Sequence, residues 1–264
     1  MALVKQVRRL AVEEPPPTEE AQPKQVGETL HWHTQESLHQ LRTVLRVKVG
    51  MPLQAVCFTH RCVYEVMLSE VDHKQVTATI ETVTHLPAPS ATAPRLFACL
   101  LKEQAWDTLL QQATELGVAD IIPVMSQHTT PLVGDVTKKL ARWREIVLRA
   151  SLQCERSTLP VIHDPIPLAE AVATVFTHLT PTPAEPSPIQ AVALVERSAQ
   201  LPALRECLLA NATPAFFIGP EGGWTVEEVG LFQTAGVQCC HVGAAVLKAE
   251  TAAMVALSVC YTQR

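Results

Sequence analysis

The stretch FFIGPEGGWTVEEVG, residues 216–230, joins an apolar run to a glycine-rich turn and then to a helix-like segment. The run 216–218 is typical of a buried strand, and it ends abruptly at GPEGG, residues 219–223. Glycine lets backbone approach a ligand closely and adopt positive φ angles. Thr225 and Glu228 have the spacing of a capping box, which fixes the start of the next helix. The stretch therefore predicts a rigidly anchored turn that binds a ligand, with a purely structural turn as the alternative.

Strand-like and helix-like segments alternate on both sides of this turn. The predicted strands are 96–101, 121–124, 191–195, 215–218 and 238–242, and the predicted helices are 104–116, 137–152, 202–210, 225–235 and 250–261, with a shorter unit at 161–176. This alternation predicts an α/β domain with a mostly parallel sheet and helices on both faces. Three successive strands end in unusual loops, at 195–196, 219–223 and 243–251. Because ligands of open α/β sheets bind beyond the strand ends, these loops form the candidate site.

The beginning of the chain has a different pattern. A capped helix is predicted from Thr34 to Leu45, and three strand-like runs follow at 52–58, 61–68 and 74–83. Short turns between the runs favour an antiparallel sheet closed into a small β-barrel. Pro87, Pro89 and Pro94 mark a linker. We therefore expect two domains, at residues 1–88 and 94–264.

Composition argues against several classes of protein. The chain has 264 residues and is 47% apolar, but it has no apolar run long enough to span a membrane, which needs about 18 residues. The N-terminal segment has no apolar core of signal-peptide length, so a cytoplasmic location is expected. The eight cysteines form no CxxC pair, and we expect them to be reduced and buried, with no metal site.

The charge pattern is ambiguous about nucleic acid. The net charge of −5 is unusual for a nucleic-acid-binding protein, which commonly has a basic face. Two local clusters differ from this average, and they provide the candidate RNA-binding residues: Arg42, Arg46 and Lys48 in the first, and Lys138, Lys139, Arg142 and Arg156 in the second. Solvated helix faces are an equally good interpretation of each cluster by itself.

The glycine-rich turn does not match a phosphate-binding loop. The pattern GxxxxGK[ST] is absent, no GxGxxG follows a strand, and Glu221 would repel phosphate. Such a turn suits a ligand that is held by backbone amides and carbonyls and carries little or no phosphate.

Several motifs in the same order resemble one known family. Residues 215–256 look like the C-terminal signature of the RsmE-type 16S rRNA (uracil-N3) methyltransferases of the SPOUT class, which read GPEGG, a helix, and then LGxxILRxETA. Lys102 with ATELGVADIIP at 113–123 resembles a second motif, and the segments 143–160 and 39–50 resemble a third and a fourth. The resemblance extends over nearly the whole chain.

The resemblance implies a PUA-like β-barrel that binds RNA and an α/β domain tied in a SPOUT trefoil knot. It implies that S-adenosyl-L-methionine (SAM) binds in the knot, held by the three loops. The residues implied to bind it are Leu194, Glu196, Ile218, Gly219, Gly223, Val242, Gly243, Val246 and Leu247. It further implies a homodimer with the site near its interface, and a uridine of 16S rRNA in the small ribosomal subunit as the substrate.

Three residues are candidates for the chemistry, in which one uracil must be exposed, lose its N3 proton and align with the methyl group. Lys248 or Arg9 would stabilise the uracil anion or hold a phosphate. Glu221 would contact the donor or its ribose, and a carboxylate placed favourably at a helix N-terminus is an equal alternative.

The chain departs from the family pattern at two positions. Lys248 and Ala249 stand where family members usually have Arg and Thr, and lysine lacks the planar fork of arginine. A SPOUT-fold RNA-binding protein with weak or no activity, or a methyltransferase for another RNA, are therefore the alternatives.

Overall fold

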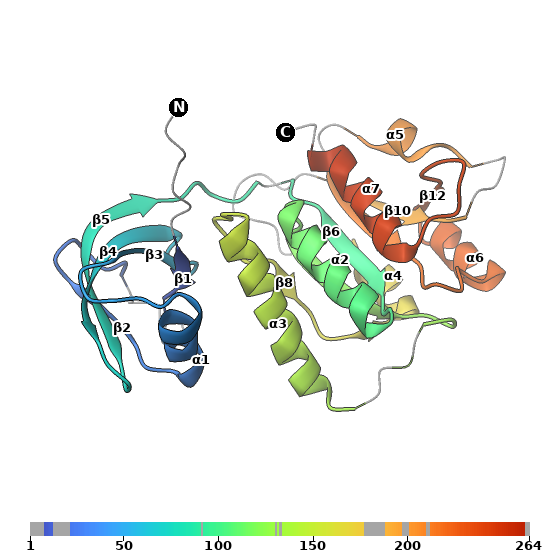
Figure 1. The fold of residues 1–264 in the computed structure, drawn as a ribbon. Coiled ribbons are helices and arrows are strands. Elements are labelled where there is room, and N and C mark those ends of the chain that lie inside the picture. The colour runs from blue at the N-terminus through green and yellow to red at the C-terminus, as the bar shows by residue number, and fades with distance from the viewer. Residues whose placement is uncertain are drawn as a thin grey trace. The chain divides into compact units, whose positions relative to one another are not determined.

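The chain forms two compact units (Figure 1). The computed structural model describes residues 8–12, 22–90, 92–129, 131, 134–176, 188–196, 201–209 and 212–261. One unit is Met1–Pro89 with Leu152–Thr158, and the other is Ser90–Ser151 with Leu159–Arg264. The sequence-based division did not anticipate that 152–158 group with the first unit. Within the described ranges, no helix has both the length and the apolar character needed to cross a membrane.

The first unit is built on a curved five-stranded sheet. Its strands run in the order β1-β3-β4-β5-β2, and they are β1 (Arg9–Ala11), β2 (Thr29–Trp32), β3 (Pro52–Cys57), β4 (Cys62–Val71) and β5 (Val76–His85). β3, β4 and β5 form the predicted antiparallel meander, and register shifts between β4 and β5 mark bulges that bend it. The short strands β1 and β2 form opposite edges, so the sheet is a half-barrel rather than the predicted closed barrel.

The predicted helix at 34–45 consists of two different helical segments. α1 (Gln35–His39) is capped by Thr34, whose Oγ1 accepts a hydrogen bond from Ser37 N at 3.3 Å. It continues into a π-helix, η1 (Gln40–Val44), and Arg46 then has a φ of 50°. π-Helical turns are rare and often occur at functional sites, and a left-handed arginine is strained. This corner is therefore shaped at a cost in conformational energy.

The second unit is built on a parallel sheet. Its main strands run in the order β12-β10-β11-β6-β7-β8, and every described pair is parallel, which agrees with the predicted mostly parallel sheet. The strands are β6 (Arg95–Cys99), β7 (Asp120–Met125), β8 (Val161–Ile162), β9 (Ile166–Pro167), β10 (Ile189–Leu194), β11 (Thr213–Ile218) and β12 (Gln238–Cys240).

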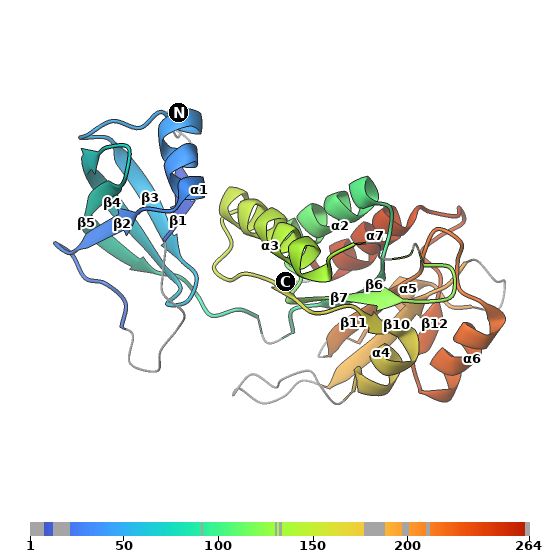
Figure 2. The ribbon, with the colours of Figure 1, turned by 90° about the horizontal axis from the view of Figure 1, so that it is seen from below.

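Helices cover both faces of this sheet, as the sequence predicted (Figure 2). They are α2 (Glu103–Glu115), α3 (Val136–Gln153), α4 (Leu168–Thr174), α5 (Leu204–Cys207), α6 (Val226–Thr234) and α7 (Ala249–Tyr261). Since side chains of a strand alternate between faces, Phe216 and Ile218 pack in a core with α2, α3 and α7, while Phe217 packs in the core with α4 and α6. Helix α5 is a single turn, shorter than the predicted 202–210.

Candidate functional site

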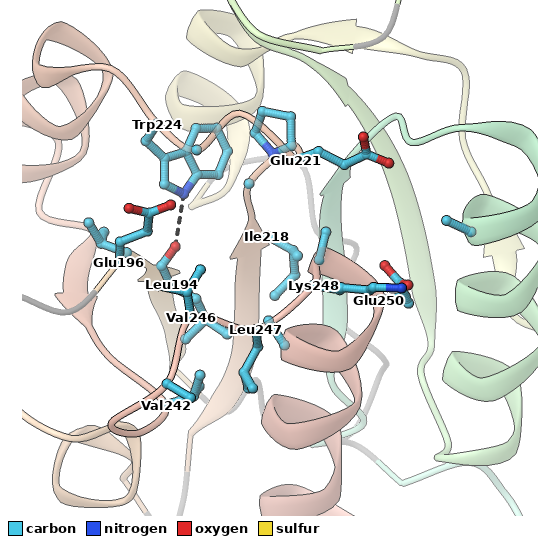
Figure 3. A pocket seen from close by; sticks show the side chains of 18 of the residues that line it. Leu194, Glu196, Ile218, Glu221, Trp224, Val242, Val246, Leu247, Lys248 and Glu250 are labelled. Carbon is cyan, nitrogen blue, oxygen red and sulfur yellow. Dashed lines mark hydrogen bonds between the residues drawn. The ribbon is translucent and has the colours of Figure 1, made fainter.

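A pocket of about 820 Å³ opens at the carboxyl ends of three neighbouring strands, β12, β10 and β11 (Figure 3). The loops that follow these strands converge on it, as the sequence predicted. All nine residues expected to bind the methyl donor line the pocket, and so do Glu221 and Lys248. The N-terminal turn of α2 contributes Lys102, Gln104 and Ala105 to the opposite wall. Residues more than 100 positions apart in the chain therefore meet in one cavity.

The 219–223 turn needs glycine at its last position. Gly223 has a φ of 70°, and its N–H donates to Pro220 O at 3.0 Å, which closes the turn. A Cβ atom at this position would lie 3.2 Å from Glu196 Oε1. An L-residue is therefore disfavoured both by the backbone angle and by the carboxylate that follows β10.

The predicted capping box at the start of α6 is confirmed. Thr225 Oγ1 accepts from Glu228 N at 3.2 Å, and Glu228 Oε2 accepts from Thr225 N at 2.9 Å. An N-cap of this kind contributes about 1 kcal/mol to stability. The other oxygen, Glu228 Oε1, accepts from Gln127 N at 2.9 Å. One carboxylate thus fixes both the helix start and the loop that follows β7.

Trp224 ties the glycine-rich turn to the neighbouring strand. Its Nε1 donates to Leu194 O at 2.9 Å (Figure 3), and its ring meets Phe232 edge-on at 4.9 Å between centroids. A Cβ atom at Gly219 would lie 3.0 Å from Trp224 Nε1, so glycine is required for this close approach. The indole therefore forms part of the pocket wall and holds two of the three loops together.

Glu221 forms an ion pair with the N-cap residue of α2. Lys102 Nζ lies 2.8 Å from Glu221 Oε2, and this hydrogen bond raises the pKa of Lys102. In Figure 3 the Glu221 carboxylate points away from Leu194 and Glu196. The side chain of Lys102 is 74% exposed and that of Glu221 is 48% exposed. Such exposed pairs contribute little to stability. The pair joins the glycine-rich turn to the start of α2.

Lys248 lies on the rim of the pocket, directly before α7. Its side chain is exposed, and within the described residues its ammonium has no hydrogen bond or ion pair. Ala249, which stands where the family pattern has a hydroxyl residue, is 8% exposed and packs in the core with α2. An apolar residue suits that position, because a buried hydroxyl would need a partner.

The chain has clear relatives among known proteins. The model of the RNA methyltransferase domain family matches residues 89–261. The ribosomal RNA small subunit methyltransferase E of Synechocystis sp. is 30% identical over 241 residues, which cover 89% of this chain and 74% of that protein. This chain belongs to the ribosomal RNA small subunit methyltransferase E family. Another member, from Mesomycoplasma hyopneumoniae, is 28% identical over 168 residues, 62% of this chain and 67% of that protein.

Solved structures share the fold of this methyltransferase. A protein of Legionella pneumophila in complex with bound SAM superposes with a TM-score of 0.81 and 26% identity, covering 97% of both chains. The ribosomal RNA small subunit methyltransferase E of Neisseria gonorrhoeae has a TM-score of 0.78, 24% identity and 97% coverage of both chains. Both likenesses extend over the two units, which supports the combination of a half-barrel with a parallel α/β sheet as the family fold.

The other predicted site residues of the methyltransferase lie outside the pocket. Arg9 belongs to the first unit, where its Nε donates to Gln54 Oε1 at 2.8 Å and its Nη2 lies 3.1 Å from Glu155. Arg42, Arg46 and Lys48 are exposed around η1. In the second cluster Arg142 pairs with Asp107 and Glu103 on α2. These ion pairs favour the alternative that Arg142 belongs to a solvated helix face.

The remaining members of the second cluster differ in their surroundings. Arg156 Nε donates to Thr158 O at 3.1 Å. Lys138 and Lys139 border a smaller pocket of about 300 Å³ between α2 and α3. The geometry thus brings Lys138, Lys139 and Arg142 to one place, and it leaves Arg156 in the segment that groups with the first unit.

Sequence reasoning missed several residues at or beside the pocket, among them Lys102, His128, Trp224 and His241. Two of them had a signal in the sequence. Lys102 lies in a motif that resembles one of the family, and Trp224 directly follows the glycine-rich turn, which was itself predicted to bind the ligand. His128 is 95 positions from its partner in the turn, and only the fold brings the two together.

Proposed function

We propose that this chain transfers the methyl group of SAM to N3 of a uridine in 16S ribosomal RNA. The observation that carries the proposal is the pocket formed by the three loops after β10, β11 and β12 in a chain of the methyltransferase E family. The Legionella structure, which holds SAM, has the same fold at 26% identity and supports this ligand. SAM supplies an activated methyl group. The protein therefore has to bind SAM and the uridine, orient them toward each other and exclude water.

The residues of the pocket fit this donor. Leu194, Ile218, Val242 and Leu247 provide apolar surface against which an adenine ring could pack. Gly219 and Gly223 bring bare backbone to the pocket wall, and Glu196 can accept from ribose hydroxyls. We assign Lys248 to the uracil, where its ammonium would stabilise the negative charge left when N3 loses its proton. We assign to Glu221 the indirect role of holding Lys102 beside the pocket. We assign Arg9, which belongs to the first unit, to contact with the RNA.

Mapping of ribosomal RNA by mass spectrometry tests this function. In cells that lack the gene, one uridine of 16S rRNA should lose a methyl group, and the purified protein with SAM should restore it at N3. A modification that changes in another RNA would replace the substrate in this proposal. A protein that binds SAM but methylates no RNA would favour the non-catalytic alternative.

The finer structural expectations of the family are proposals as well. They are a SPOUT knot in the second unit, which carries methyl transfer, a PUA-like character for the first unit, which binds RNA, and a cytoplasmic homodimer. Helix α7 supports the dimer, because it combines the small buried residues Ala253 and Ala256 with Val255 and Val259, which keep part of their surface. Light scattering at micromolar concentration should therefore give twice the chain mass of 28.8 kDa. A mass of 28.8 kDa, that of one chain, at every concentration tested would contradict the dimer.

The exposed cations around η1 are proposed to bind RNA phosphates. Replacing Arg42, Arg46 and Lys48 together with alanine should weaken binding to the small ribosomal subunit roughly tenfold. It should also reduce the slope of log affinity against log salt concentration by about two to three units. With fewer phosphate contacts, fewer counterions are released on binding. Filter binding at several salt concentrations measures both quantities.

The control for this triple variant is Lys74→Ala, an exposed lysine at the turn before β5. It should leave the affinity and the slope unchanged, and both proteins should bind SAM like the wild type. A triple variant with wild-type RNA affinity across salt would mean that the η1 corner is only a solvated surface.

A further inference from the structure

The loop after β7 packs against the glycine-rich turn. His128 Nδ1 lies 3.1 Å from Gly223 O, and Gln127 N donates to Glu228 Oε1. Within the described residues, no other side chain forms a hydrogen bond with a peptide group of the 219–223 turn. His128 is not among the residues that line the pocket. It therefore contacts the donor turn without contacting the space that the donor would occupy.

The chemistry of this contact fixes the direction of the hydrogen bond. A carbonyl oxygen only accepts, so His128 Nδ1 must carry the hydrogen and donate it to Gly223 O. The fit is also close, because a Cβ atom on Gly222 would lie 3.0 Å from His128 Cβ. The absence of a side chain at Gly222 is what allows the imidazole to reach the carbonyl.

The peptide that His128 holds joins Gly223 to Trp224. Gly223 has a φ of 70°, and glycine can rotate about its backbone bonds at little steric cost. His128 fixes the carbonyl of this peptide, while the Trp224 indole is fixed by its bond to Leu194 O at 2.9 Å. Gly223 and Trp224 both line the pocket. Losing the first bond would let the wall adopt other conformations before the donor binds.

We propose that His128 is a positioning residue, which holds the Gly223–Trp224 peptide in the orientation that binds SAM. This inference rests on the proposed function, since it concerns the same pocket. Binding to a wall that is ordered only part of the time lowers the apparent affinity by the populated fraction. The defect therefore belongs to donor binding and not to the methyl-transfer step at saturating donor.

Three variants of the full-length protein test the geometry. His128→Ala removes the imidazole N–H that bonds to Gly223 O. The dissociation constant for SAM, measured by calorimetry, should then rise roughly three- to tenfold, as expected for one hydrogen bond. His128→Asn should restore most of the affinity, because its amide nitrogen occupies the place of Nδ1. His128→Gln should not, because its amide nitrogen corresponds to Nε2. The KM for SAM should follow the same order, while kcat changes less than twofold.

The pattern across the variants decides between the outcomes. A His128→Ala protein with wild-type affinity would overturn the inference, and so would a His128→Asn protein as weak as His128→Ala. If His128→Ala does not fold, as judged by circular dichroism, the difference between the Asn and Gln variants still decides. Failure of the wild type to bind SAM would instead overturn the proposed function itself. Binding of SAM by the wild type with equal affinity in all variants overturns only the role of His128.

Discussion

Replacing Gly223 with valine should raise the dissociation constant for SAM roughly 30-fold. Valine at a φ of 70° is strained, because its branched Cβ meets the backbone, and such strain costs about 2 kcal/mol. Its Cβ would also lie 3.2 Å from Glu196 Oε1, so the carboxylate has to move. The turn relieves both conflicts by leaving its present conformation, and a cost of about 2 kcal/mol corresponds to roughly 30-fold in affinity.

Calorimetric titration with SAM measures this effect, and Gly230 provides a matched control. Gly230 lies within α6, and a Cβ there would meet nothing within 4 Å. Gly230→Ala should therefore bind SAM as the wild type does and be slightly more stable, since alanine favours helix by about 0.5–1 kcal/mol. A folded Gly223→Val protein with unchanged affinity would show that the turn does not hold the donor.

Removing the charge of Lys248 should have the largest effect on turnover. We expect Lys248→Met to reduce the rate of methyl transfer roughly 100-fold at saturating SAM, because one stabilising group at a developing charge contributes about 10²–10³ in rate. Donor affinity should change less than twofold, since the exposed ammonium lies on the rim of the pocket. Single-turnover transfer of a labelled methyl group to unmethylated small subunits measures the rate.

Two further variants separate the charge of Lys248 from its shape and from charge in general. Lys248→Arg keeps the cation and has the residue typical of the family, so it should retain activity. Lys74→Met removes an exposed lysine of the first unit and should have no effect. Wild-type rates in Lys248→Met would assign the stabilisation of the uracil anion to another group.

Local pattern was enough to predict the elements around the donor turn. The capping box of Thr225 and Glu228, the buried run before Gly219 and the alternation of strands with helices all depend on residues within a few positions of one another. Parallel strands place their carboxyl ends at one edge, so the meeting of three loops also followed from the pattern. The strand order itself did not follow, because it depends on which buried surfaces pack together.

Contacts between distant residues were beyond the reach of the sequence. Lys102 and Glu221 are 119 positions apart, and no periodicity relates them. The η1 segment escaped prediction because apolar residues at helical spacing do not distinguish a π-helical turn from an α-helical one. The half-barrel was predicted as closed because alternation defines strands but not whether the edge strands β1 and β2 meet.

The position of β11 has a consequence for how the donor turn moves. All six residues of β11 are buried, and hydrogen-bonded neighbours flank the strand on both sides, β10 and β6. Amide hydrogens in such a central strand exchange with solvent only when the whole unit opens. The glycine-rich turn begins at the end of this strand. One of its two ends is therefore anchored in the most protected part of the sheet. Any motion of the turn as the donor enters therefore has to come from rotation about its own backbone bonds, beyond the anchored end at Ile218.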